Sequence, residues 1–450
     1  MGGTLSGRSM PAVERSGAAL LIALIAFVAS VVVTLATIVD MRRAFLLDAA
    51  SYQKLGSPSA FLSYTPWHIL VLVLALVGGV ASYRVLRSVE SVSARDDLKR
   101  ARTALAAILM AVLIVDLFTY RIVQAERVAA AGKAGVAKTF AVDALPAWLR
   151  PLGEAVNFLL VVWHATLLGM LIGALFLVLL CSSQRLKQVY QLRGLRAHLL
   201  GSASAVAYPF CSCCAGPVGA SLYRGGASLE STLAFVVAAP LLNVTTLFLA
   251  TALLPADFAL LRIVGGAVLA VFGTWLVALT VRRRPPVVAS ERSGRGLRWL
   301  ERSLRAFALE DHLRGRRIES PADLVAAWLA TAWRIARVAV PMLLVAATVI
   351  GWVAPVVTAL SGGNTAATVL FATLIGVLFM IPTWTELAIA AALIQQGLTG
   401  PAAALLLALP AVSLPSLVIY GAALRDWRVP ALLVVVVVAL SAAAGLAFLR

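Results

Sequence analysis

The stretch GAALLIALIAFVASVVVTLATIV, residues 17–39, carries no charged side chain and is long enough to cross a lipid bilayer as a single helix. A second run of this kind, PALLVVVVVALSAAAGLAFL, occupies residues 430–449. Of the 450 residues, 61% are hydrophobic and 13% are charged, whereas a soluble domain has about half apolar and about a quarter charged residues. The sequence therefore excludes a soluble globular protein and predicts an all-α polytopic membrane protein.

The charged residues lie in the gaps between the apolar runs, and most of them are basic. The net charge is +18, and the gaps 87–102 and 281–305 are rich in arginine. Basic gaps are typical of cytoplasmic loops, so we expect the lipid bilayer, and no nucleic acid, as a partner. No A-x-A cleavage site follows the run 17–39, which is also too long for the apolar part of a signal peptide, so it is predicted to be a retained span.

Nine stretches have the length and apolar character that a membrane-crossing helix requires. They are 17–39, 66–86, 103–123, 155–181, 229–253, 258–281, 336–358, 401–422 and 429–449. Two further apolar stretches, 195–222 and 365–396, are interrupted in the middle. Because proline removes a backbone donor and clashes with the preceding turn, helix breaks are predicted near these residues: Pro209, Gly216 and Pro217 in the first stretch, and Pro382 in the second.

The distribution of basic residues favours a particular topology. The gaps 182–197 and 282–317 are both basic and are both expected in the cytoplasm. They lie on the same side only if 195–222 enters and leaves the membrane as a re-entrant hairpin. The same reasoning makes 365–396 a second hairpin, entering from outside. The prediction is a bacterial cytoplasmic-membrane protein with nine spans and two hairpins, with the N-terminus in the cytoplasm and the C-terminus outside.

An internal repeat relates the two hairpins. In the first half, Pro209 is followed by the motif AAPLLN, which contains Pro240. In the second half, Pro382 is followed by the motif ALPAVS, which contains Pro410. The second pair lies about 170 residues after the first. Each unit contains an odd number of crossings, so the second copy is predicted to be inverted. Inverted repeats with broken helices are typical of secondary transporters. The predicted organisation is three accessory spans and a loop in 1–150, one repeat in 151–281, a basic loop in 282–324 and a second repeat in 325–450.

Three thiols lie beside the first predicted break. Cys211, Cys213 and Cys214 crowd into the stretch YPFCSCCAGP together with Ser212. Thiolates are ligands for soft ions, so we expect these residues to contact a substrate. The alternative is that the cysteines are small residues that fill a tight turn. A structural zinc site would need further ligands that the sequence lacks, so no bound metal or cofactor is predicted.

Polar residues follow the two repeated prolines, and one acid follows the second hairpin break. Asn243 and Ser413 occupy matching positions, after Pro240 and Pro410. Each is expected either to contact the substrate or to stabilise the helix kink beside it. Glu386 is the only acid in the second hairpin. A carboxylate in the membrane is costly to bury, so proton coupling is the expected role and capping of the following half-helix is the alternative.

Two further polar residues lie in the apolar spans. Asp116 is expected to pair with Arg121 near the membrane face, and His164 is expected to be a packed histidine bonded to a backbone carbonyl.

The residues from Pro209 to Asn243 resemble the signature of a family of predicted permeases that includes the organoarsenical efflux permeases. The matching positions are Pro209, Cys211, Ser212, Cys213, Pro217, Leu222, Gly225, Phe235, Pro240 and Asn243. The block GPAAALLLALPAVSLPSLVI resembles the family's second copy, and the resemblance covers roughly 155–450. It implies export of a trivalent organoarsenical or another soft-metalloid compound, with Cys211 and Cys213 as transient ligands and a role in arsenic resistance. Cys214 departs from the pattern, since the family usually has glycine there.

The function expected from these features is that of a permease, not an enzyme, which exports a small molecule by proton-coupled alternating access. No G-x-x-x-x-G-K-[ST] motif for ATP is present. One alternative is a membrane-embedded thiol oxidoreductase that uses Cys211 and Cys213, and another is a passive channel. The sequence leaves open whether the chain assembles as a homo-oligomer.

Overall fold

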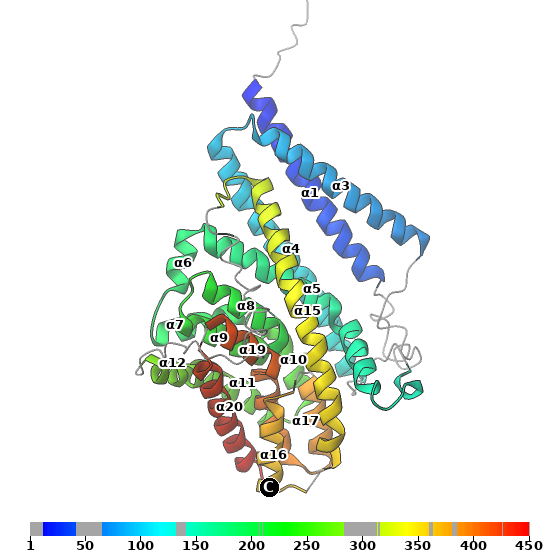
Figure 1. The fold of residues 1–450 in the computed structure, drawn as a ribbon, viewed down its shortest axis with the longest axis vertical. Coiled ribbons are helices and arrows are strands. Elements are labelled where there is room, and N and C mark those ends of the chain that lie inside the picture. Colours follow the sequence, from blue (N-terminus) through cyan, green and yellow to red (C-terminus); the bar gives the residue numbers. More distant parts are fainter. Residues whose placement is uncertain are drawn as a thin grey trace, which may run out of the picture.

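The computed structural model describes residues 12–41, 65–131, 141–206, 208, 210–282, 313, 316–359, 363–379, 385–424 and 426–449 (Figure 1). Within these ranges the chain is all-helical and contains no strand. The helices are α1 (Ala12–Met41), α3 (Pro66–Glu90), α4 (Arg95–Ala131), η3 (Val142–Ala144), α5 (Arg150–Ser182), α6 (Gln184–Tyr190), α7 (Leu195–Ala205), α8 (Ser212–Arg224), α9 (Leu229–Leu242), α10 (Val244–Leu253), α11 (Ala256–Val268), the π-helical turn η4 (Leu269–Gly273), α12 (Thr274–Arg282), α15 (Pro321–Ala359), α16 (Ala366–Gly376), α17 (Thr385–Gln395), α18 (Thr399–Ala411), α19 (Leu414–Leu424) and α20 (Arg428–Ala447).

The predicted number of membrane spans is confirmed for the part of the chain that the structure describes. Nine helical segments are long and apolar enough to cross a bilayer. They are Gly17–Met41, Pro66–Glu90, Arg95–Tyr120, Trp163–Ser182, Leu229–Leu253, Ala256–Val281, Pro321–Val345, Thr399–Gly421 and Arg428–Ala447. The seventh differs most from its expected bounds, 336–358, because α15 runs from Pro321 to Ala359 and so includes both ranges.

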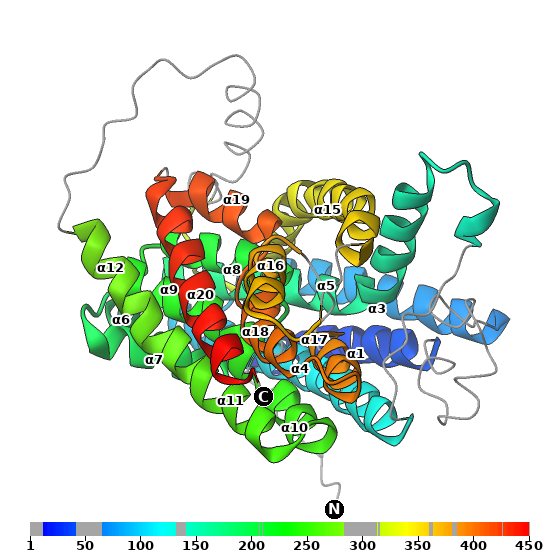
Figure 2. The ribbon, with the colours of Figure 1, turned by 90° about the horizontal axis from the view of Figure 1, so that it is seen from below.

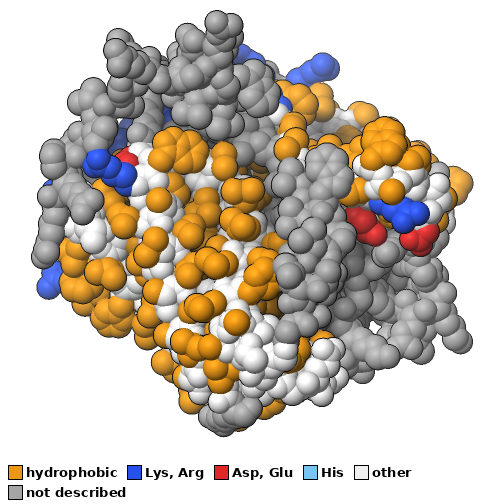
Figure 3. Space-filling model, turned by 60° about the horizontal axis from the view of Figure 1, so that its bottom comes forward, with side chains coloured by type: hydrophobic (Ala, Val, Ile, Leu, Met, Phe, Trp, Pro, Cys, Tyr) orange, Lys and Arg blue, Asp and Glu red, His pale blue; other side chains and the backbone are white. Residues whose placement is uncertain are grey.

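The surface matches a lipid environment. Figure 3 shows one face over which hydrophobic side chains are spread, while the basic and acidic side chains lie towards its edges. Large side chains such as Leu74, Leu260 and Val435 are each about 60% exposed. Such a surface would be unfavourable in water, but in a bilayer it faces acyl chains of the same polarity.

The core is built around two helices that hold the repeated prolines. The spans that contain α9 and α18 are each 83% buried, more than any other candidate span. Helices α7, α8 and α11 pack on α9, and α16, α17 and α20 pack on α18 (Figure 2). Because α9 and α18 also contact each other, they join the two halves of the core.

A second contact between the halves runs along the long helices α5 and α15, which lie side by side. Trp328 on α15 donates its indole N–H to the carbonyl oxygen of Leu171 on α5, at 2.8 Å. The N-terminal helices α1 and α3 form a pair beside this core (Figure 1). Helix α4 connects that pair to α5, α10 and α15.

Corresponding turns in the two halves have the same backbone geometry. Gly226, after α8, has φ +102°, and Gly397, after α17, has φ +77°. In each case the residue after the glycine donates its N–H five residues back, from Ala227 to Leu222 at 3.0 Å and from Leu398 to Leu393 at 2.8 Å. This is the Schellman ending of a helix, which favours glycine because a left-handed residue with a side chain is strained.

Both predicted hairpin stretches contain an interrupted helix. The first stretch has α7 and α8 separated by residues 206–211, and the second has α16 and α17 separated by residues 377–384. Whether each stretch turns back within the membrane stays a prediction. Pro209 and Pro382 lie outside the described residues.

Candidate functional site

Each interrupted helix is tied at its break to a neighbouring helix that is also broken. The N–H of Val244, the first residue of α10, donates to the carbonyl oxygen of Val206 at the end of α7, at 3.3 Å. The N–H of Leu414, the first residue of α19, donates to the carbonyl oxygen of Leu378 after α16, at 3.2 Å. Backbone groups at membrane depth need such partners, since no water is available in the hydrocarbon. The two breaks therefore have the same local construction about 170 residues apart.

The first break is packed by aromatic rings, and Cys211 follows them. Tyr208 and Phe210 stack with ring centroids 5.5 Å apart, and both approach Phe235 on α9. Cys211 occupies the N-cap position of α8 and is 5% exposed, and the adjacent Ser212 is 4% exposed. The structure thus buries one thiol among apolar side chains at the start of α8. The side chains of Cys213, Cys214 and Pro217 lie outside the described part of the structure.

Gly216 and Pro217 are not at the break. Helix α8 runs from Ser212 to Arg224 without interruption, so both residues lie inside it. One missing donor at a proline does not end a helix when the turns on either side hold. Gly216 instead permits close packing, because an added Cβ would lie 3.3 Å from the Cα of Ser416 on α19. Its small size brings α8 of the first half against α19 of the second.

Asn243 bridges the break between α9 and α10 with both ends of its amide. Its Nδ2 donates to the carbonyl oxygen of Ala239 at 2.7 Å, and its Oδ1 accepts the N–H of Thr246 at 3.0 Å. The hydroxyl of Thr246 donates to the Asn243 carbonyl at 3.0 Å. Asn243 therefore caps the end of one helix and the start of the next. Pro240 lies inside α9, three residues before this break.

Ser413 occupies the matching break between α18 and α19. Its N–H donates to Ser416 Oγ at 2.9 Å, and the Ser416 hydroxyl donates back to the Ser413 carbonyl at 2.8 Å. This second bond repeats the one made by Thr246 in the first half. Pro410, like Pro240, lies inside its helix, before the break. Both polar positions stabilise the kinks, and their contact with a substrate stays a prediction.

The feature that sequence reasoning missed is the partner of Glu386. Glu386 lies in the first turn of α17 and is 2% exposed, and Arg262 on α11 is fully buried. Arg262 Nη2 donates to Glu386 Oε1 at 2.9 Å. A signal was present, since Arg262 is the only charged residue of the predicted span 258–281. A charged side chain in an apolar run is functional by default and needs a partner.

Arg262 also satisfies backbone groups that the two kinks leave open. Its Nη2 donates to the carbonyl oxygen of Pro240 at the end of α9, at 3.0 Å, and its Nη1 donates to that of Leu406 on α18. Leu406 is four residues before Pro410, which has no N–H to offer it. One guanidinium thus connects both kinked helices and the half-helix α17. Both members of this ion pair are buried: the Arg262 side chain is fully buried and that of Glu386 is 2% exposed.

A second polar contact joins the accessory spans to the core. Asp116 Oδ2 on α4 lies 3.3 Å from His164 Nε2 on α5. The ring of Tyr120 meets the His164 ring edge-on, with centroids 4.6 Å apart. Asp116 was expected to pair with Arg121, whose side chain lies outside the described residues. The partner it has in the structure comes from another helix.

The described residues contain no group of three or more histidine, cysteine, aspartate or glutamate side chains arranged to hold a metal ion. The described part of the site consists of a thiol, two bridged helix breaks and an arginine–glutamate pair.

Most of the chain is similar to known proteins. Residues 155–449 match the family described as predicted permease. The chain is 32% identical over 281 residues to UPF0718 protein YraQ of Escherichia coli K12, covering 61% of this chain and 74% of that protein. It is 26% identical over 259 residues to UPF0718 protein MJ0584 of Methanocaldococcus jannaschii, covering 46% of this chain and 69% of that protein. No solved structure matches the chain.

The family match begins in α5, so α1, α3 and α4 lie outside it, and it includes every residue of the two broken stretches and their ties. The resemblance that the thiol and proline motifs indicated is confirmed. The chain belongs to the predicted permease family.

Proposed function

We propose that this protein is a secondary transporter that moves a small solute across the cytoplasmic membrane by alternating access between two inverted repeats. The observation that carries the proposal is the pair of matching backbone ties, from Val244 to Val206 and from Leu414 to Leu378. Broken helices that meet near the middle of a bundle form the binding sites of many transporters. The N-terminus is proposed to lie in the cytoplasm, as the basic gaps require.

The solute is proposed to pass the first break, where Cys211 is held beside Tyr208 and Phe210. A trivalent organoarsenical has an apolar substituent and a soft centre that binds thiolates, so aromatic rings and a thiol suit both of its parts. Cys213 and Cys214 are proposed as further ligands, with Ser212, Asn243 and Ser413 along the same path. The expected direction is export.

Glu386 is proposed to couple transport to protons through its pair with Arg262. Protonation of Glu386 removes its charge, and the attraction to Arg262 falls sharply in a medium of low dielectric constant. Arg262 then keeps the two carbonyl oxygens of the kinked helices, while its hydrogen bond to Glu386 loses the charge that strengthens it. The half-helix that begins at Thr385 would be held less tightly to α11, which gives protonation a mechanical consequence.

The test is transport in everted membrane vesicles that contain the full chain. Trivalent methylarsenical, arsenite, antimonite and a thiol-containing metabolite are supplied as probes. Wild type is compared with Cys211→Ser, and Cys181→Ser on α5 is the matched control for loss of a thiol. We expect accumulation by wild type and Cys181→Ser, and loss of accumulation by Cys211→Ser for the arsenical. Equal rates for all three proteins would rule out a thiol ligand at Cys211.

The coupling mechanism has its own test in the same vesicles. Uptake by wild type should collapse when an uncoupler removes the proton gradient, and Glu386→Gln should lose the response of transport to the gradient. If Glu386→Gln keeps the wild-type dependence on pH, Glu386 is not the coupling group. If solute never accumulates above its electrochemical equilibrium in wild type, the protein is a channel.

A further inference from the structure

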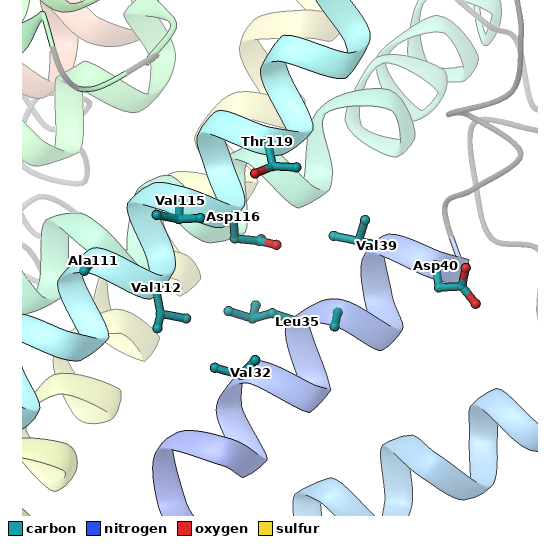
Figure 4. Close-up of a pocket in the computed structure, with 10 residues that line it drawn as sticks. Val32, Leu35, Val39, Asp40, Ala111, Val112, Val115, Asp116 and Thr119 are labelled. Atoms are coloured by element: carbon teal, nitrogen blue, oxygen red, sulfur yellow. The ribbon is translucent and has the colours of Figure 1, made fainter. Parts of the chain in front are cut away.

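A cavity lies between α1 and α4, outside the residues that match the permease family. Its volume is about 720 Å³, within the range of about 300–1,000 Å³ that small-molecule sites occupy. The walls are mostly aliphatic, with Val32, Leu35 and Val39 on α1 facing Val112 and Val115 on α4 (Figure 4). The cavity is therefore suited to an apolar molecule of moderate size.

Two carboxylates interrupt these apolar walls. Asp116 extends from α4 towards Leu35 and Val39 of α1, and Asp40 lies at the end of α1 (Figure 4). The Asp116 side chain is 12% exposed, and the Asp40 side chain is 50% exposed. A carboxylate in the hydrocarbon region is costly and marks a site where a positive group binds. An acyl chain would fill the cavity without using either charge.

Each carboxylate also contacts a histidine on a neighbouring helix. Asp40 Oδ2 lies 2.7 Å from His68 Nε2 on α3, and Asp116 Oδ2 lies 3.3 Å from His164 Nε2 on α5. The two carboxylates belong to different helices of the cavity wall, α1 and α4. The contact with His164 places Asp116 at the junction of the accessory spans and the first helix of the permease region.

We propose that this cavity is a binding site for an amphiphilic organic cation that enters from the lipid phase. The apolar body of the ligand lies against the valine and leucine side chains of α1 and α4. Its positive centre lies beside Asp116, which supplies the negative charge in surroundings of low dielectric constant. The site does not depend on the transport mechanism proposed above, because none of its walls belongs to the broken helices.

The probe for the test is radiolabelled tetraphenylphosphonium, a cation with an apolar surface. Equilibrium binding is measured on the full-length protein in lipid nanodiscs. Wild type is compared with Asp116→Asn, and Asp96→Asn, an exposed acid at the start of α4, is the matched control for loss of one negative charge. We expect Asp116→Asn to weaken binding by about tenfold or more, and Asp96→Asn to leave it unchanged.

Two further measurements separate the possible occupants. Neutral triphenylphosphine oxide should not displace the cation, because it has the apolar body without the charge. Val112→Phe reduces the cavity without changing any charge and should also weaken binding. Displacement by the neutral compound, or equal binding by wild type, Asp116→Asn and Val112→Phe, would overturn the proposal and assign the cavity to lipid chains. Gel filtration of each variant identifies any that fails to fold, and Val112→Phe then decides the outcome.

Discussion

Removal of Arg262 should be among the most damaging single changes in this protein. The substitution Arg262→Met keeps an unbranched apolar stem and deletes the charge. It leaves Glu386, which is 2% exposed, as a buried carboxylate without its 2.9 Å partner. It also deprives the carbonyl oxygens of Pro240 and Leu406 of their donor. The structure therefore predicts two separate costs.

The magnitude follows from those two costs. Removing one member of a buried ion pair costs about 3–5 kcal/mol, because the other charge remains buried. Leaving a buried polar group without a partner costs about 1–3 kcal/mol. Arg262→Met should therefore lower the free energy of unfolding by at least about 4 kcal/mol. Glu386→Gln should lower it by less, about 1.5–3 kcal/mol, because glutamine keeps an oxygen that accepts from Arg262.

The double variant Arg262→Met/Glu386→Gln tests the reasoning directly. With both charges gone, no uncompensated ion is left, so its cost should be smaller than the sum of the two single costs by about 2–3 kcal/mol. The assay is reversible unfolding of the purified protein in mixed micelles, followed by circular dichroism. The exposed pair formed by Arg95 and Glu319 provides the control cycle, for which a much smaller coupling is expected because water screens both groups.

Additive costs would refute this account. If the double variant loses the sum of the single losses to within about 0.5 kcal/mol, Arg262 and Glu386 do not stabilise each other. A loss of unfolding free energy in the double variant that exceeds this sum would refute the account more strongly. It would mean that each charge is stabilised by groups other than its partner in the ion pair.

Three further predictions concern the rest of the fold. Gly397→Ala should destabilise the protein by about 1–2 kcal/mol, measured as a lower Tm, because Gly397 has φ +77°. Gly363→Ala is the control and should have little effect, because Gly363 has neither a positive φ nor a close neighbour that an added Cβ would meet. Trp328→Phe should cost about 1 kcal/mol in unfolding free energy through loss of its hydrogen bond to α5. The guanidinium of Arg95 lowers the pKa of Glu319, so Glu319→Gln should be less stable than wild type at neutral pH, and the difference should disappear as the pH falls below about 4.

The membrane class and the number of spans could be predicted from the sequence because they depend on length and composition. The length and apolar character of a run such as 17–39 are sufficient to predict that it crosses the bilayer, without knowledge of the neighbouring helices. The matching prolines, Pro240 and Pro410, could also be found, since a proline acts on its own helix. These are properties of single segments, so they can be predicted without knowing which other segments pack against them.

The site could be predicted only in part because its central contact joins helices far apart in the chain. Glu386 was identified as an unusual acid, but its partner, Arg262, lies on α11, 124 residues earlier. Gly216 was assigned to a helix break from its residue type. Its role is set by Ser416 on a distant helix, which no local pattern reveals. Spacing within one segment indicates where a polar group lies, but not what it faces.

The two halves share their backbone geometry but not their charges, and this difference bears on mechanism. The turns at Gly226 and Gly397 and the two ties at the breaks recur about 170 residues apart. The position that corresponds to Arg262 at this offset is Leu432, so the second half has no equivalent arginine. In the alternating access proposed above, two similar units would exchange conformations, whereas the pair formed by Arg262 and Glu386 has no counterpart related by this offset. Any movement of the half-helix α17 away from α11 must separate that pair. The coupling energy of about 2–3 kcal/mol between Arg262 and Glu386 is similar to the free-energy difference between two conformations of a protein, which is a few kcal/mol. A single ion pair of this strength would allow protonation of Glu386 to shift the equilibrium between the two conformations of the proposed transporter.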